Sequence, residues 1–183
     1  ETIASNLVKR FSLGFFDDNE PFFNKEVSET MYKDMPPSFC RDSKGRTYIF
    51  YKDNATGGDS KVILKRYTSE GEEDTSFSYS VDGSDKTNIL VTADNKTGNV
   101  FVSYKENATP PQTKLFLVQE GNPAIPKDIT PPSGISGDTY AMSAYNNIIS
   151  TVEWGSASAY SSYKVKLYKY NGENTSILKI GEG

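Results

Sequence analysis

Apolar and polar residues alternate along much of this chain, with the period of two that is typical of a half-buried β-strand. In residues 76–81, serine alternates with Phe77, Tyr79 and Val81, and residues 163–170 follow a similar pattern with lysine. Further runs that contain aromatic or β-branched residues lie at 47–51, 61–67, 88–93, 100–104, 114–118, 140–144, 148–154 and 176–180. Turns rich in Gly, Asn, Asp and Ser separate these runs, which predicts an all-β protein of short strands.

One stretch of the sequence returns at a fixed distance. Residues 51–56 read Tyr-Lys-Asp-Asn-Ala-Thr, and residues 104–109, which lie 53 positions later, read Tyr-Lys-Glu-Asn-Ala-Thr. The match extends without a gap, because Gly45 falls on Gly98 and Leu64 on Leu117. A more divergent third copy begins near residue 138. A unit of about fifty residues with four short strands has the size of one β-propeller blade.

The repeat therefore predicts an all-β fold of about three four-stranded antiparallel, blade-like units. We place them in an all-β repeat domain, 37–183, with approximate divisions 37–84, 85–137 and 138–183. Residues 1–36 lie outside the repeat, and we expect them to form an extended N-terminal segment that packs on the repeats.

Two segments depart from the regular strand pattern. In the second unit, Pro126, Pro131 and Pro132 would each remove a donor from a strand ladder, so we expect an edge strand or an open loop there. In the N-terminal segment, residues 25–33 place Glu26 and Glu29 at a helical spacing, which allows one or two helical turns before the prolines that follow.

Three blades are too few to close a ring, because propellers typically contain four to eight. The chain is then either a part of a longer propeller, one of several copies that together form a ring, or an open or stacked array of sheets. Terminal blades expose unpaired strand edges, which favour association with another chain. Self-assembly into a homo-oligomer is therefore one expectation.

Charge and hydropathy exclude two classes of partner. The net charge is −4 and the sequence pI is about 5.0, whereas a nucleic-acid-binding face is basic and clustered. Apolar runs stay far below the roughly 20 residues of a membrane-spanning helix. We expect neither a nucleic-acid partner nor a membrane span. The single cysteine, Cys40, excludes a disulfide within the chain.

The residue types needed for much of enzyme chemistry are missing. The sequence has no histidine, which excludes Ser-His-Asp and Cys-His catalysis and the commonest metal ligand. Residues 70–74 are rich in glutamate but form a predicted turn, where charges are usually solvated. Residues 17–20 and 82–85 are rich in oxygen atoms but lack the spacing of a known calcium loop. We predict no catalytic residue, no metal site and no cofactor.

The turn at residues 42–48, Asp-Ser-Lys-Gly-Arg-Thr-Tyr, resembles the signature turns of bacterial-type and sialidase-type propeller repeats, and the turn at 95–101 is its second copy. In those repeats an Asp and a Gly shape the turn and an aromatic residue follows. The sialidase Asp-box has one residue fewer between the two than Asp42 and Gly45 have here. The resemblance implies a propeller fold and, as an alternative function, part of a glycoside hydrolase, whose sialidase-like form would need several converging arginines. The chain has four arginines, Arg10, Arg41, Arg46 and Arg66.

Two aromatic residues are candidates for ligand contact. Trp154, the single tryptophan, ends a predicted strand before a loop of small residues that leads to Tyr160. An aromatic ring in this position either stacks on a sugar or caps the core. Asn-X-Ser/Thr sequons lie in predicted turns or loops, where a eukaryotic secreted protein would be glycosylated, at Asn54, Asn95, Asn107 and Asn174.

A clear repeat without catalytic residue types favours a binding or assembly protein, secreted or on the cell surface, with a glycan or a protein as its partner. Two alternatives stay open at this point. One is a sialidase-like glycoside hydrolase of which this chain is a part, and the other is a structural subunit that assembles through its blade edges.

Overall fold

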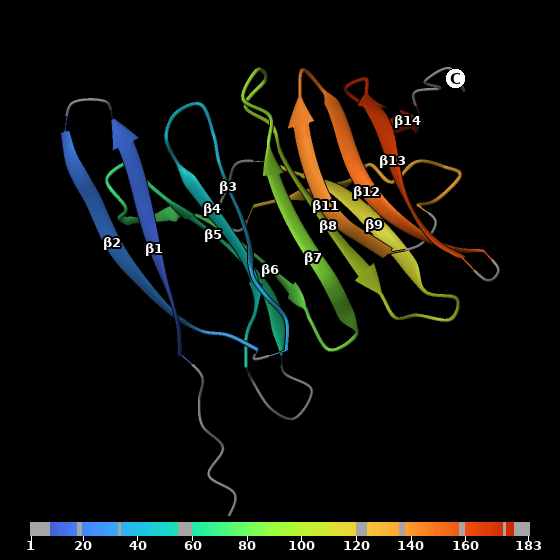
Figure 1. Cartoon of the computed structure of the whole chain (residues 1–183), viewed down its shortest axis with the longest axis horizontal. Helices are drawn as coiled ribbons and strands as arrows, with labels where there is room; N and C mark the ends of the chain where they lie inside the picture. Colours follow the sequence, from blue (N-terminus) through green and yellow to red (C-terminus); the bar gives the residue numbers. More distant parts are fainter. Residues whose placement is uncertain are drawn as a thin grey trace, which may run out of the picture.

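The computed structural model describes residues 8–17, 20–32, 34–54, 60–119, 124–135, 138–157, 160–173 and 175–177. For residues 8–30, 154–157, 160–162 and 177 it describes the backbone alone. All regular elements in the described residues are β-strands (Figure 1).

The strands form one hairpin and three antiparallel sheets. The hairpin consists of β1 (Val8–Asp17) and β2 (Glu20–Thr30). The first sheet consists of β3 (Ser38–Arg41), β4 (Thr47–Lys52), β5 (Lys61–Tyr67) and β6 (Glu73–Asp82). The second consists of β7 (Lys86–Ala93), β8 (Val100–Glu106), β9 (Gln112–Val118) and β10 (Pro126–Asp128). The third consists of β11 (Asp138–Tyr145), β12 (Ile148–Ala157), β13 (Tyr160–Tyr170) and β14 (Thr175–Ile177).

The expected fold class is confirmed: the protein is all-β, with three four-stranded antiparallel sheets whose strands pair in sequence order, and the described residues form no closed ring. The proline-rich segment of the second sheet is the short edge strand β10, as predicted. The helical turn expected within residues 25–33 is wrong, because residues up to Thr30 belong to β2 and pair with β1. A weak helical spacing of charges does not outweigh the backbone pairing of a neighbouring strand.

The first strand of each sheet lies at the centre of the arrangement. Strand β7 lies between β3 and β11, and the remaining strands of each sheet fan outwards from them (Figure 1). The sheets therefore pack face to face in the order of the chain. We call the face of each sheet that points to the next sheet its leading face, and the opposite face its trailing face.

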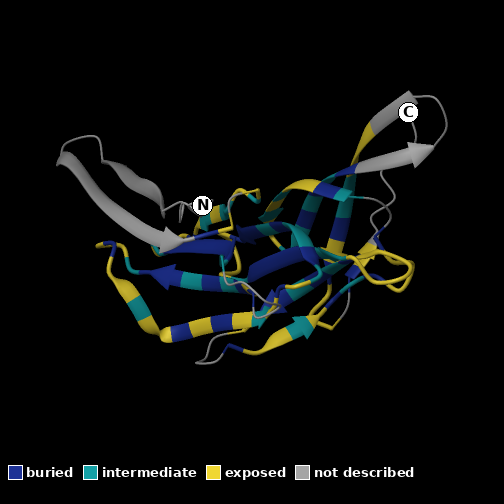
Figure 2. Ribbon diagram, turned by 90° about the horizontal axis from the view of Figure 1, so that it is seen from below, coloured by how far each residue is buried: buried dark blue, intermediate teal, exposed yellow. Residues whose placement is uncertain are grey.

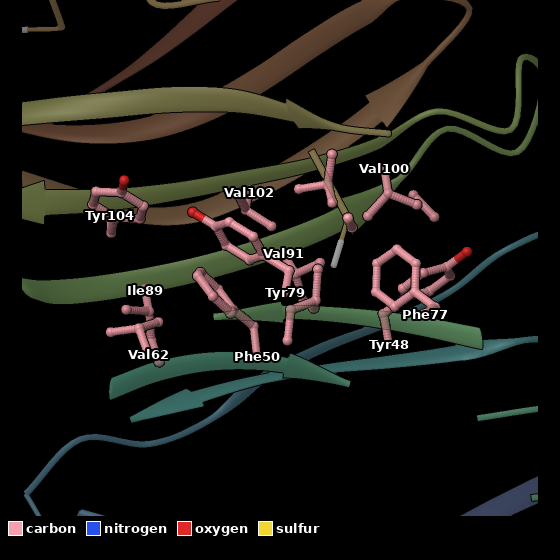
Figure 3. Packing of buried hydrophobic residues seen from close by; sticks show 14 residues of the cluster. Tyr48, Phe50, Val62, Phe77, Tyr79, Ile89, Val91, Val100, Val102 and Tyr104 are labelled. Carbon is pink, nitrogen blue, oxygen red and sulfur yellow. The ribbon is translucent and has the colours of Figure 1, made fainter. Parts of the chain in front are cut away.

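The largest core cluster lies between the first two sheets. Phe50 points from the leading face of the first sheet towards Val91 and Val102 on the trailing face of the second (Figure 3). Leu64, which is paired with Phe50 on the neighbouring strand, belongs to the same cluster. Tyr48 meets Phe77 edge to face, with ring centroids 5.8 Å apart, in the same cluster. Strands β4 and β8 are buried at nearly every position, because both faces of their sheets are covered.

The second and third sheets pack in the same way. Phe101, Leu115 and Leu117 on the leading face of the second sheet meet Ile149 and Tyr168 on the trailing face of the third. A third cluster covers the trailing face of the first sheet, where Met31 packs with Ile49, Tyr51 and Tyr67. The second strands β4 and β8 are buried at nearly every position, whereas exposed residues lie at turns and also alternate with buried ones along β6. Figure 2 shows exposed residues both at turns and along strands.

Shortening a side chain between the first two sheets should destabilise the whole chain. Leu64 is 0% exposed, and we expect Leu64→Ala to lower the free energy of unfolding by about 2–5 kcal/mol, because it removes apolar contacts and leaves a cavity. Urea unfolding followed by circular dichroism measures the loss. Phe39, which is 65% exposed on β3, is the matched control, and Phe39→Ala should change stability by less than about 0.5 kcal/mol. Equal effects of the two substitutions would contradict the assigned core.

Candidate functional site

The repeated Tyr-Lys-Asp/Glu-Asn motif joins each sheet to the next. Lys52, on β4, brings its Nζ to 3.5 Å from the carbonyl oxygen of Lys86, the first residue of β7. Lys105, at the matching place on β8, forms an ion pair of 2.6 Å with Asp138, the first residue of β11. Each lysine thus contacts the start of the following sheet, so the repeated motif has a structural role.

The tyrosines of the same motif belong to the core. Tyr104 is buried between the first two sheets and stacks on Phe116 with ring centroids 5.1 Å apart. Tyr51 is buried in the cluster around Met31. Burial raises the pKa of the Tyr104 hydroxyl above its usual value, and the nearby Tyr79 adds to the effect. These rings are not available to a ligand.

Two aspartates, Asp42 and Asp94, organise backbone amides in the turns between the first and second strands of their sheets. The Asp42 carboxylate accepts hydrogen bonds from the N–H groups of Lys44 and Arg46, each at 2.9 Å, and pairs with the Arg46 side chain at 2.7 Å. Gly45 in this turn has a φ of 78°, a conformation that glycine adopts without strain. Asp42 is buried within its own turn, so we assign its carboxylate the structural role of capping the backbone N–H groups there.

Asp94 performs the same task for two turns at once. Its carboxylate accepts a hydrogen bond from the backbone N–H of Lys96 in its own turn, at 2.9 Å. It also accepts hydrogen bonds from two backbone N–H groups in the hairpin turn of the third sheet, those of Asn146 at 2.9 Å and Asn147 at 2.6 Å. Asn146 and Asn147 both have positive φ angles, as a tight two-residue hairpin requires. Asp94 therefore ties the second sheet to the third.

A buried acid lies inside the third sheet's packing face. Glu153 on β12 accepts hydrogen bonds from the hydroxyls of Thr151, at 2.9 Å, and of Tyr168, and forms an ion pair of 2.6 Å with Lys166. Burial, followed by the hydrogen bond to Glu153, raises the pKa of the Tyr168 hydroxyl. Glu153 is 1% exposed and lines none of the cavities described below, so we assign it a structural role.

A pocket opens where the first strands of the second and third sheets begin. Its volume is about 270 Å³, and we call it the inner pocket. Its walls come from β7, β11 and the segment before β3, and its lining residues are Asp34, Met35, Pro36, Thr87, Asn88, Ile89, Leu90, Thr139 and Tyr140.

Both strands that wall the inner pocket are irregular at the pocket. The pairing of β7 with β8 shifts register between Thr87 and Leu90, and Asn88 has a φ of 49°. The pairing of β11 with β12 shifts between Thr139 and Ala141. Such bulges are common beside binding sites, because they re-aim side chains that a regular strand would point elsewhere.

One polar group in the inner pocket is buried and unpaired. Thr139 is 2% exposed, and its hydroxyl finds no hydrogen-bond partner in the described part of the chain. Buried polar side chains in native proteins are almost always hydrogen-bonded, and an exception needs an explanation such as a bound ligand or water. Thr139 is thus a lining residue of the inner pocket with a buried hydroxyl that lacks a partner among the described residues.

An aromatic pair stands at the rim of the pocket. Tyr140, which is 44% exposed, meets Tyr163 of β13 edge to face with ring centroids 5.9 Å apart. Its hydroxyl lies 3.5 Å from the carboxylate of Asp138. The backbone of Trp154, on β12, lies between β11 and β13, where it pairs with Asp138 on one side and with Tyr163 on the other.

The candidate ligand-binding and glycosylation residues predicted from the sequence differ in how much of them the structure describes. The side chains of Trp154 and Tyr160 lie outside the described residues, and so does Asn174; Tyr160 pairs through its backbone with Ala157. Asn95 and Asn107 are exposed, whereas Asn54 is half-buried. The sequence did not predict that Asn88, Thr139 and Tyr140 line a pocket. It indicated only that these residues lie at or next to the starts of two predicted strands.

Two other cavities lack the feature that distinguishes the inner pocket. One, of about 210 Å³, lies near Tyr48 and Asn99, and another, of about 490 Å³, lies around Pro131 and Gly134. None of the buried polar atoms that lack a partner in the described residues belongs to either lining. We therefore take the inner pocket as the candidate site.

Among the described residues, no cluster of three or more acidic, cysteine or histidine side chains is arranged to hold a metal ion. No helix in that part of the chain is long and apolar enough to span a membrane. Neither a model of a known protein family nor a curated protein matches the sequence.

The role of Asp94 predicts a pH dependence of stability. Burial opposes its ionisation, but the N–H donors outweigh burial and lower the pKa of the Asp94 carboxyl. A lowered pKa in the folded state stabilises the protein above the unfolded-state pKa, about 3.9, and this contribution disappears as the pH falls through the folded-state pKa. Asp94→Asn should cost about 1–3 kcal/mol at pH 7.

The difference in unfolding free energy between wild type and Asp94→Asn should shrink as the pH falls below about 4. Urea titrations at a series of pH values measure it. A difference that stays constant down to pH 3 would show that the charge of Asp94 is not what stabilises the two turns.

Proposed function

We propose that this protein is a secreted or cell-surface binding protein whose inner pocket binds carbohydrate. The buried Thr139 hydroxyl is the observation that supports the proposal. An unpaired buried polar group costs about 1–3 kcal/mol, and a ligand hydroxyl that pairs with it removes this cost. The free protein therefore has a built-in preference for a ligand that brings a hydrogen-bonding group to Thr139.

The other groups in the pocket favour a neutral ligand with several hydroxyls. Thr87 supplies a hydroxyl, Asn88 an amide and Asp34 a carboxylate, while Ile89 and Leu90 supply apolar surface. Amide and carboxylate groups bind the hydroxyls of a sugar, and the apolar side chains suit its C–H groups. No lysine or arginine is among the lining residues, so nothing in the lining favours an anionic ligand.

The volume of the inner pocket and the aromatic ring at its rim restrict the size and shape of the ligand. A pocket of about 270 Å³ lies just below the range of roughly 300–1,000 Å³ that holds drug-sized ligands, so it suits a single sugar ring. The exposed ring of Tyr140 at the rim offers a flat apolar surface on which a second ring of the same glycan would stack. A terminal sugar of a longer glycan meets both conditions.

The lining favours binding over hydrolysis. Glycosidases use a pair of Asp or Glu side chains on either side of the scissile bond. Asp34 supplies the one carboxylate among the described residues that line the pocket. A single exposed carboxylate can hold a sugar hydroxyl but does not form the required pair.

A conservative change at Thr139 tests the site. Thr139→Val keeps the side chain's shape and removes the unpaired hydroxyl, so it should leave stability unchanged or slightly higher. A panel of free hexoses and N-acetylhexosamines, screened by saturation-transfer NMR and then titrated by calorimetry, provides the probes. The variant should bind the sugar selected from the panel at least about tenfold more weakly, a loss of about 1.4 kcal/mol.

Thr92→Val is the matched control, because Thr92 is a buried threonine of β7 that does not line the pocket. It should leave sugar affinity unchanged. Wild-type protein that binds no sugar of the panel, or a Thr139→Val variant with wild-type affinity, would overturn the proposal.

The proposed location predicts glycosylation. When the chain is secreted from a eukaryotic cell line, Asn95 and Asn107 should be modified, because both are exposed in turns or loops, and the half-buried Asn54 should be modified less. Intact-mass measurement before and after treatment with peptide-N-glycosidase gives the occupancy. An unmodified mass would count against the proposal that these sequons are used.

A further inference from the structure

In two places the sequence puts a glycine directly after a side chain that can close on the backbone. They are Asp82-Gly83, at the end of β6, and Asn171-Gly172, in the turn that joins β13 to β14. The backbone nitrogen of such a glycine can attack the side-chain carbonyl carbon of the residue before it, because glycine has no Cβ to obstruct the approach. The product is a cyclic succinimide. The surroundings of each glycine nitrogen therefore decide where this reaction occurs in the folded chain.

The first of these two places is protected. The Gly83 N–H donates a hydrogen bond to the carbonyl oxygen of Ser60 at 2.8 Å, which holds the nitrogen away from the Asp82 side chain. Gly83 is buried, and a Cβ there would lie 2.8 Å from the carbonyl carbon of Lys61, so the backbone has no room to rearrange. The backbone N–H and the hydroxyl of Ser84 lower the pKa of the Asp82 carboxyl. Asp82 is therefore ionised at neutral pH, and a carboxylate is a poor target for attack.

The second place has none of these constraints. Asn171, Gly172 and Glu173 are exposed, and the Gly172 N–H donates to no acceptor among the described residues. Gly172 has a φ of 98°, and no atom lies within 4 Å of the position that a Cβ would take. The backbone of this turn therefore has space to bring the Gly172 nitrogen towards the Asn171 side chain.

A hydrogen bond also activates the Asn171 side chain. The backbone N–H of Glu173 donates to Oδ1 of Asn171 at 2.9 Å. Attack on the side-chain carbon places negative charge on this oxygen, and a donor that is already aimed at the oxygen stabilises the charge as it develops. The amide is neutral, unlike the Asp82 carboxylate, and its nitrogen can leave as ammonia.

We propose that Asn171 is a site of spontaneous deamidation in the folded chain, with water as the co-reactant. The Gly172 nitrogen forms a bond to Cγ of Asn171, and the Cγ–Nδ2 bond breaks. Nδ2 takes the proton of the Gly172 N–H and leaves as ammonia. Water then opens the succinimide at either of its two carbonyl carbons. One product is aspartate, and the other is isoaspartate, in which the backbone runs through the side chain and is longer by a methylene group.

The isoaspartate product changes a contact between two sheets. The Gly172 carbonyl oxygen accepts hydrogen bonds from the Tyr170 hydroxyl at 2.7 Å and from Nζ of Lys127 at 3.0 Å. Lys127 lies on β10 of the second sheet, so this oxygen links the second sheet to the third. An extra methylene group in the turn displaces the oxygen, whereas aspartate keeps the backbone length and leaves the link in place.

Ageing of the whole folded chain at mildly alkaline pH, followed by peptide mapping with mass spectrometry, tests the proposal. The Asn171 peptide should gain the mass of an Asn-to-Asp change, and isoaspartyl methyltransferase should methylate part of it. Asn171→Gln should abolish the change, because its side chain closes a larger ring. Gly172→Ala, which adds a Cβ beside the attacking nitrogen, should slow it at least about tenfold. Both variants alter an exposed turn, and circular dichroism checks that they are folded.

The Asp82 peptide is the internal control, since methyltransferase should label it only when the chain is aged unfolded in urea. An Asn171 peptide that changes more slowly in the folded chain than in urea would overturn the proposal, because the fold would then protect the turn. Equal labelling of the Asp82 and Asn171 peptides in the folded chain would overturn it as well. Neither residue lines the inner pocket, so the outcome does not depend on sugar binding.

Discussion

Burial of one sheet face against the next is the interaction on which the rest of this structure depends. Each fully buried side chain such as Phe50 or Leu64 contributes about 1.5–3 kcal/mol, and the cluster between the first two sheets contains many of them. The polar links between sheets are weaker: a hydrogen bond such as that of Lys52 contributes about 0.5–1.5 kcal/mol, and a partly exposed ion pair such as Lys105–Asp138 about 0–1 kcal/mol. The core therefore provides the stability, and the lysines and Asp94 fix how each sheet is placed on the last.

The inner pocket is a consequence of this packing. The first strands β7 and β11 come together at the centre, where the sheets converge, and both lose their regular pairing at their starts. Thr139 stands next to the register shift of β11, and its hydroxyl is buried and without a partner among the described residues. The site is thus built from local departures from the sheet geometry that the remainder of each strand maintains.

The all-β class and the three four-stranded units could be predicted from the sequence. The alternation of apolar and polar residues can be read within each strand, and the repeat can be found by comparing segments 53 residues apart. The short β10 also followed from Pro126, whose effect on a ladder is local. The hairpin strand β2 did not, because its pairing with β1 is not visible in the spacing of its charges. The pocket was equally hidden: Asn88 and Thr139 are ordinary strand residues in sequence, and only the approach of two distant strands brings them to one cavity.

The aromatic pair of Tyr140 and Tyr163 links the inner pocket to the outer face of the third sheet, which points away from the second sheet. Tyr140 lines the pocket, and Tyr163 lies on that outer face. An aromatic pair of this kind contributes about 0.5–1.5 kcal/mol beyond the area it buries, so it sets an upper limit on how strongly the two sites influence each other through it. That limit corresponds to a change of about tenfold in affinity. A ligand bound in the inner pocket would therefore change the outer face of the third sheet at most modestly through this pair.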